Sequence, residues 1–98
     1  MDNRIVVFSK PGCPYCAKAK EFLDSLNLSF TEISLNPNEN NYEYKRNRLF
    51  NHYNHDSYPI IVIDNQLVGG YSELIQSYHS LKLHKMCHNI NLYLPMDF

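Results

Sequence analysis

Residues 5–26 read IVVFSKPGCPYCAKAKEFLDSL, and this stretch decides the fold. The run 5–8 is wholly apolar, which predicts a buried strand, and the next four residues include a proline and a glycine, which predict a turn. After the turn, apolar residues recur at helical spacing as far as Leu26. The sequence therefore predicts a strand, a turn and a helix, with Cys13 and Cys16 at the start of that helix.

Two cysteines spaced C-x-x-C at the start of a helix are typical of a redox pair. The unpaired N–H groups and partial positive charge of a helix N-terminus favour an anion, and Lys10 adds a nearby cation. We therefore expect Cys13 to be the nucleophilic thiolate. Cys16 follows about one turn later on the inward face of the helix, where we expect it to be the resolving thiol. Pro14 suits the first turn, because a missing N–H costs no hydrogen bond there.

Composition limits the class of protein. The chain has 98 residues, 44% of them hydrophobic, and a formal net charge of −1. This length suits one domain with a modest core, and the charge gives no electrostatic footprint for nucleic acid. No apolar run reaches the length needed to span a membrane, and residues 1–4 contain no signal-peptide core. One local cysteine pair plus Cys87 is not a secreted disulfide framework, so we expect a cytoplasmic protein.

The rest of the chain alternates between strand and helix patterns. Residues 29–35 alternate, with Thr31, Ile33 and Leu35 on one side, and predict the second strand. A second helix is predicted over 42–53. The apolar run 60–63 predicts a third strand, and 66–68 a short return strand. A last helix is expected with Ser72 as its N-cap and with an inner stripe of Leu74, Ile75, Tyr78 and Leu81.

This order of elements, β-α-β-α-β-β-α, predicts an α/β fold. The strands 5–8 and 60–63 lack alternation, which indicates a sheet covered on both faces. We expect a four-stranded mixed sheet with helices on both sides, in a single domain that spans residues 1–98. Residues 89–98 show no periodicity and stay unassigned.

Three separated motifs resemble those of the glutaredoxins, small dithiol proteins of the thioredoxin-like fold. They are KPGCPYC at 10–16, SYP at 57–59 and GGYSEL at 69–74, and the similarity spans about residues 4–82. The dipeptide between the two cysteines resembles glutaredoxins, whereas thioredoxins usually carry Gly-Pro there. The resemblance implies reduction of protein disulfides and protein–glutathione mixed disulfides, with glutathione as the reducing co-substrate.

The resemblance also implies a glutathione pocket built from all three motifs. Pro59 resembles the cis-proline that faces the disulfide in this family, and the backbone of Tyr58 would pair with glutathione. The N–H groups of Ser72 and Glu73 at a helix start are suited to bind a carboxylate. Beside the catalytic Cys13 and Cys16, the implied glutathione-binding residues are Lys10, Tyr15, Tyr58, Pro59, Gly70, Tyr71, Ser72 and Glu73.

Two positions depart from the family pattern. Tyr58 stands where the family usually has a small β-branched residue, which changes the wall of the pocket. Glu73 stands where Asp is common; that acid is implicated in holding the γ-glutamyl amine. An acid in the first helical turn is also favoured by the helix dipole without any ligand, so both roles stay open for Glu73.

Other functions fit parts of the sequence. A thioredoxin-like reductant supplied by thioredoxin reductase is one alternative, and a glutaredoxin that binds an iron–sulfur cluster is another. A zinc site would need Cys13 and Cys16 together with Cys87, His84 and His88, from a different element, so we expect no metal. By family analogy the clients are disulfide-containing proteins, with ribonucleotide reductase as one of them, in deoxyribonucleotide synthesis and cell redox homeostasis. We expect a monomer without nucleic-acid or membrane partners.

Overall fold

The chain folds as strands and helices in the predicted order, with one further helix at the end. The computed structural model describes residues 4–90, 92 and 94. The predictions for the other residues, at the N-terminus (1–3) and in the tail (91, 93 and 95–98), lie outside the described part. The elements are β1 (Ile5–Ser9), α1 (Pro14–Ser25), β2 (Thr31–Ser34), α2 (Tyr42–Tyr53), β3 (Ile60–Ile63), β4 (Gln66–Gly69), α3 (Tyr71–His79) and α4 (Lys82–His88).

The four strands form one mixed sheet in the order β2-β1-β3-β4. Strand β1 runs parallel to β2 and antiparallel to β3, and β3 runs antiparallel to β4. In this register Val7 lies between Glu32 on β2 and Ile61 on β3. The sheet confirms the predicted fold class and places the end of β1, from which the chain enters the cysteine motif, between two strands.

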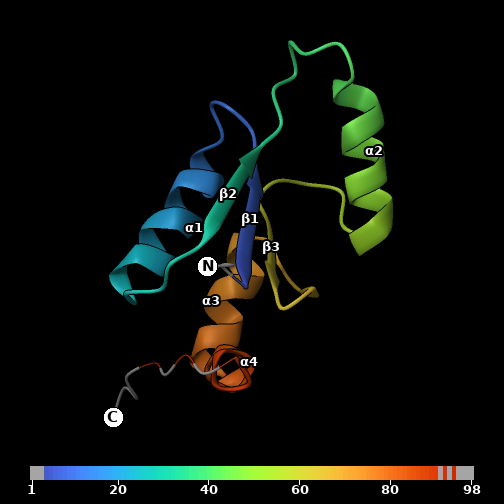
Figure 1. The fold of residues 1–98 in the computed structure, drawn as a ribbon. Coiled ribbons are helices and arrows are strands. Elements are labelled where there is room, and N and C mark those ends of the chain that lie inside the picture. The colour runs from blue at the N-terminus through green and yellow to red at the C-terminus, as the bar shows by residue number, and fades with distance from the viewer. Residues whose placement is uncertain (1–3, 91, 93, 95–98) are drawn as a thin grey trace.

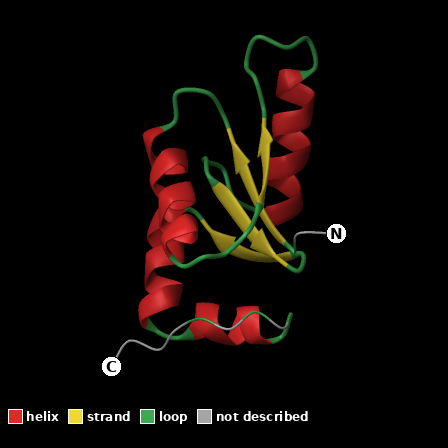
Figure 2. Cartoon of the chain, turned by 60° about the vertical axis from the view of Figure 1, so that its left-hand side comes forward, coloured by secondary structure: helices red, strands yellow, loops and turns green. Residues whose placement is uncertain are grey.

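The helices form layers on the two faces of the sheet. Helices α1 and α3 cover one face, with α4 across the end of α3, and α2 lies over the other face (Figures 1 and 2). Strand β3 is buried along its whole length, as its unbroken apolar run predicts, whereas α2 contributes no buried residue. None of the described helices is long and apolar enough to cross a membrane.

The hydrophobic core fills the space between the sheet and the helices α1, α3 and α4. Alternate residues of β1 point into it, because successive side chains of a strand face opposite sides. Its described members are Ile5, Val7, Ala19, Leu23, Leu28, Ile61, Ile63, Leu74, Leu83, Met86, Cys87, Ile90 and Leu94.

The structure corrects three details of the sequence interpretation. Gly70, not Ser72, is the N-cap of α3, so this helix starts earlier than predicted. Leu81 is not part of an inner stripe: it is 47% exposed and has a φ of 67°, which ends α3 and opens α4. Ile33 is 43% exposed although Leu35 is buried, because β2 is an edge strand shorter than the predicted 29–35.

Candidate active site

The cysteine pair lies at the start of α1, just after the loop that connects β1 to this helix. Cys13 is the N-cap of α1, Pro14 occupies the first turn, and the backbone N–H of Cys16 donates to Cys13 Sγ at 3.2 Å. The two cysteines form a disulfide with their Cα atoms 5.2 Å apart. Cys16 is only 2% exposed, whereas Cys13 is partly open to solvent. This geometry gives the two sulfurs different surroundings: Cys13 has a helix-terminal donor and solvent access, and Cys16 has neither.

The fold brings the three sequence motifs together around this pair. Lys10 Nζ lies 5.5 Å from the centre of the Tyr58 ring, which joins the first motif to the second. The rings of Tyr15 and Tyr71 lie 6.0 Å apart, which joins the first to the third. A Cβ added to Gly70 would stand 3.5 Å from the Pro59 carbonyl oxygen, so the second and third motifs touch.

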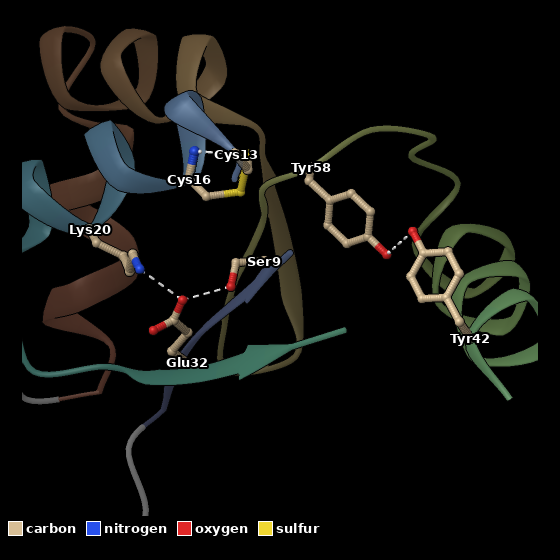
Figure 3. The surroundings of a disulfide bond; sticks show 7 residues. All are labelled: Ser9, Cys13, Cys16, Lys20, Glu32, Tyr42 and Tyr58. Atoms are coloured by element: carbon tan, nitrogen blue, oxygen red, sulfur yellow. Dashed lines mark hydrogen bonds and ion pairs between the residues drawn. A yellow bond between two sulfur atoms is a disulfide. The ribbon is translucent and has the colours of Figure 1, made fainter. Parts of the chain in front are cut away.

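The loop before β3 carries the residues of the second motif. The Tyr58–Pro59 peptide bond is cis, and Pro59 is fully buried. The Tyr58 side chain points away from the cysteines toward α2 (Figure 3), and its hydroxyl lies 3.2 Å from that of Tyr42. Burial, together with this hydrogen bond, raises the pKa of Tyr58 well above that of an ordinary tyrosine. Tyr58 thus links α2 to the active-site loop, a contact that the motif did not predict.

The start of α3 forms the third side of the site. Glu73 Oε1 accepts a hydrogen bond from the Gly70 N–H at 2.7 Å, so this acid caps the helix. Gly69 has a φ of 124°, and a Cβ on it would stand 2.7 Å from Glu73 Cβ, so the position requires glycine. Ser72 and Glu73 remain in the first turn, where backbone N–H groups have no partner within the helix.

A polar cluster lies below the disulfide, on β1, α1 and β2. Glu32 Oε2 accepts from Ser9 Oγ at 2.6 Å and from Lys20 Nζ at 2.8 Å (Figure 3). These two hydrogen bonds lower the pKa of Glu32, that with Lys20 more than that with Ser9. The motifs did not point to this cluster. One signal was present in the sequence, because Lys20 follows Cys16 by four residues and therefore lies on the same helix face.

The residues considered for zinc are not gathered into one site. His84, Cys87 and His88 lie on α4, with Cys87 buried in the core, whereas Cys13 and Cys16 lie at the start of α1. Burial raises the pKa of the Cys87 thiol. Within residues 4–90, 92 and 94, no group of three or more His, Cys, Asp or Glu side chains could hold a metal ion.

Comparisons with known proteins agree with this arrangement. The family model described as Glutaredoxin matches residues 5–68. Glutaredoxin 1 of Rickettsia bellii is 36% identical over 73 residues, covering 74% of each chain. Glutaredoxin 3 of Escherichia coli is 33% identical over 70 residues, covering 71% of this chain and 80% of the relative. Among solved structures, a buckwheat glutaredoxin–glutathione complex superposes with a TM-score of 0.82 at 25% identity, covering 93% of this chain and 82% of that one. The chain therefore belongs to the glutaredoxin family, whose members are thiol–disulfide oxidoreductases.

Proposed function

We propose that this protein is a dithiol glutaredoxin that reduces protein–glutathione mixed disulfides and protein disulfides at the expense of glutathione. The observation that carries the proposal is the meeting of the three motifs around a half-open Cys13 at the N-terminus of α1. Lys10, Tyr15, Tyr58 and Tyr71 belong to the motifs that meet there, and Lys10 lines the same hollow as Cys13. The buckwheat relative supports this ligand class, because its structure is a glutathione complex.

Reduction of a mixed disulfide needs only Cys13. Its thiolate attacks the glutathionyl sulfur, the client leaves as a thiolate that takes up a proton, and Cys13 is left bonded to glutathione. A second glutathione thiolate then attacks that adduct, which releases oxidised glutathione and restores the Cys13 thiolate. The helix-terminal N–H groups stabilise the leaving Cys13 thiolate in this last step.

Reduction of a protein disulfide uses both cysteines. Cys13 attacks one client sulfur, and the Cys16 thiolate then attacks Cys13, which frees the client dithiol and leaves the Cys13–Cys16 disulfide. Two glutathione molecules reduce that disulfide, and a glutathione reductase with NADPH regenerates them. By family analogy we propose ribonucleotide reductase as one client and the cytoplasm as the place of action, with the protein working as a monomer.

The test is turnover of a small glutathione mixed disulfide, coupled to NADPH through glutathione reductase. The proposal expects robust turnover in the parent, loss of turnover in Cys13→Ser and retained turnover in Cys16→Ser. Activity in the parent only when thioredoxin reductase replaces glutathione would overturn the proposal in favour of a thioredoxin-like reductant. A coloured protein that holds iron and sulfide and lacks turnover would overturn it in favour of cluster binding.

A further inference from the structure

The polar cluster below the disulfide lies in the same hollow as the cysteines. A cavity of about 390 Å³ is lined by Cys13, Cys16, Lys20 and Glu32, among others. In Figure 3 the Glu32 carboxylate lies under the disulfide, and Lys20 extends to it from the helix that carries Cys16. Cys16 is 2% exposed, and it lines this cavity together with Lys20 and Glu32.

Lys20 follows Cys16 by four residues on α1, whereas Lys18, two residues after Cys16, does not share its helix face. Residues four apart on a helix are neighbours, with Cβ atoms roughly 5–6 Å from each other. A cation on the same side of the helix as a thiol favours the thiolate over the thiol. Glu32 opposes this effect, because its carboxylate holds Lys20 Nζ at 2.8 Å and carries the compensating negative charge. The charged and titratable groups that line the cavity are Lys10 from the loop before α1, Cys13, Cys16 and Lys20 from the cap and body of α1, and Glu32 from β2.

We propose that the Lys20–Glu32 pair sets the charge that the Cys16 thiol meets, and thereby how readily Cys16 resolves a mixed disulfide held by Cys13. Both residues are positioning residues, since they act through the Cys16 sulfur. Ser9 assists by fixing the carboxylate: its side chain is buried and donates to the same Glu32 oxygen at 2.6 Å. The two charges of the pair compensate each other, so it presents little net charge to Cys16, whereas the Cys13 sulfur accepts a helix-terminal N–H.

The step affected is the second half of dithiol exchange, so the inference rests on the proposed function. Cys16 loses its proton, its sulfur bonds to the Cys13 sulfur, and the Cys13–client bond breaks with the client leaving as a thiolate. No external oxidant or reductant enters this step. Removing the negative charge leaves Lys20 uncompensated and raises the thiolate fraction of Cys16, and removing the positive charge does the reverse.

The test follows this step without glutathione. The reduced protein is mixed with dithiobis(nitrobenzoate), whose coloured thiolate is released twice: once when Cys13 forms the mixed disulfide and again when Cys16 resolves it. The Cys16→Ser variant, which lacks the second phase, identifies that phase. Its rate is then measured against pH in the parent, Glu32→Gln, Lys20→Met and the double variant.

We expect the midpoint of the pH–rate profile of the second phase to shift in opposite directions in the two single variants. The midpoint of the pH–rate profile should fall by about one pH unit in Glu32→Gln and rise by about as much in Lys20→Met. Below the midpoint, the larger thiolate fraction should make the second phase of Glu32→Gln faster than that of the parent. The increase should be only about threefold, because a thiolate of lower pKa is also less nucleophilic. The double variant should return close to the parent. Glu21→Gln and Lys85→Met, exposed positions that carry the same charge changes, should leave the profile unshifted.

Shifts of the same sign in both single variants, or shifts no larger than those of the exposed controls, would overturn the proposal, because a merely structural pair would behave in those ways. A parent without a second phase would show instead that dithiol exchange itself fails. Since the probe is not glutathione, a defect in glutathione binding leaves this assay unaffected.

Discussion

At the scale of single residues, Tyr58 joins the active-site loop to α2. Its side chain reaches α2, where it meets Tyr42 and Phe50. Lys10 lies over its other side. Tyr58 therefore supplies a contact between α2 and the cis-proline loop, and its side chain points away from the cysteines (Figure 3).

The hydroxyl pair of Tyr42 and Tyr58 should contribute measurable stability. We expect Tyr42→Phe and Tyr58→Phe each to lower the free energy of unfolding by about 0.5–1.5 kcal/mol, because each change leaves a partly buried hydroxyl without its partner. The double variant should lose less than the sum. Urea unfolding measures this coupling, with Tyr44→Phe, a 65% exposed ring, as the control. Fully additive losses would show that the two hydroxyls do not interact in solution.

Glu73 caps α3, and substitutions can separate this role from the glutathione contact proposed for it. Its carboxylate caps α3 through the Gly70 N–H, and its charge is the group that would hold the glutathione amine. Glu73→Ala should lower the free energy of unfolding by about 1 kcal/mol through the lost cap. Glu73→Gln keeps an oxygen for the cap, so it should retain most stability yet raise the KM for glutathione.

Unfolding curves and steady-state kinetics on the same two variants of Glu73 decide between these roles. An unchanged KM in Glu73→Gln would show that the acid serves the helix alone.

At the scale of elements, α2 is the helix held least firmly by the rest of the molecule. It has no buried residue, and its described ring contacts to other elements run through Tyr53 and Phe50, whereas α4 buries Leu83, Met86 and Cys87. Among the described helices, only α2 lies on the face of the sheet opposite α1 and α3 (Figure 2). Local opening should therefore start at α2 rather than at the α1–α3–α4 layer.

Matched leucine truncations test this difference between helices. Leu83→Ala removes a fully buried side chain and should cost about 2–5 kcal/mol, while Leu49→Ala on α2 should cost clearly less, because Leu49 is only partly buried. Urea unfolding of the two variants gives the costs, and amide exchange should show faster exchange in α2 than in α4. Equal costs and equal exchange would contradict the picture of a loosely held α2.

The elements show why the sequence predicted most of the fold but missed parts of it. Strand β3 and helix α1 were predictable because the positions of their apolar residues show which side chains are buried in the core. Helix α4 was missed because Leu81, an apolar residue at helical spacing from Tyr78, adopts a left-handed conformation that no periodicity reveals. The start of α3 was placed too late because the cap is made by Glu73 reaching back to Gly70, not by a serine hydroxyl.

In the active site, the sequence predicted the residues that lie within the three motifs and did not predict the contacts outside them. The motifs predicted the cysteine pair, the cis-proline and the glycine turn, since each lies in a short recognisable segment. The Ser9–Lys20–Glu32 cluster joins three elements, and only the parallel pairing of β1 with β2 brings Glu32 beneath α1.

At the scale of the whole molecule, Glu32 makes the free energy of unfolding depend on pH. Its folded-state pKa is lowered, so its contribution is present above the pKa that the residue has in the unfolded chain and is lost as pH falls through the folded value. The unfolding free energy of the parent should therefore exceed that of Glu32→Gln near neutral pH, and the gap should close in acid. Denaturant unfolding across pH measures the gap, with the exposed Glu21→Gln as control. A gap that is constant with pH would contradict this linkage.

The proposed chemistry requires that the sulfur of Cys13 accept the glutathionyl group. The most direct measurement is the intact mass and peptide map of Cys16→Ser after incubation with oxidised glutathione. The account predicts a single glutathione adduct on Cys13, because that sulfur is solvent-accessible while Cys87 is buried in the core. Absence of an adduct, or an adduct on Cys87 in the folded protein, would contradict it.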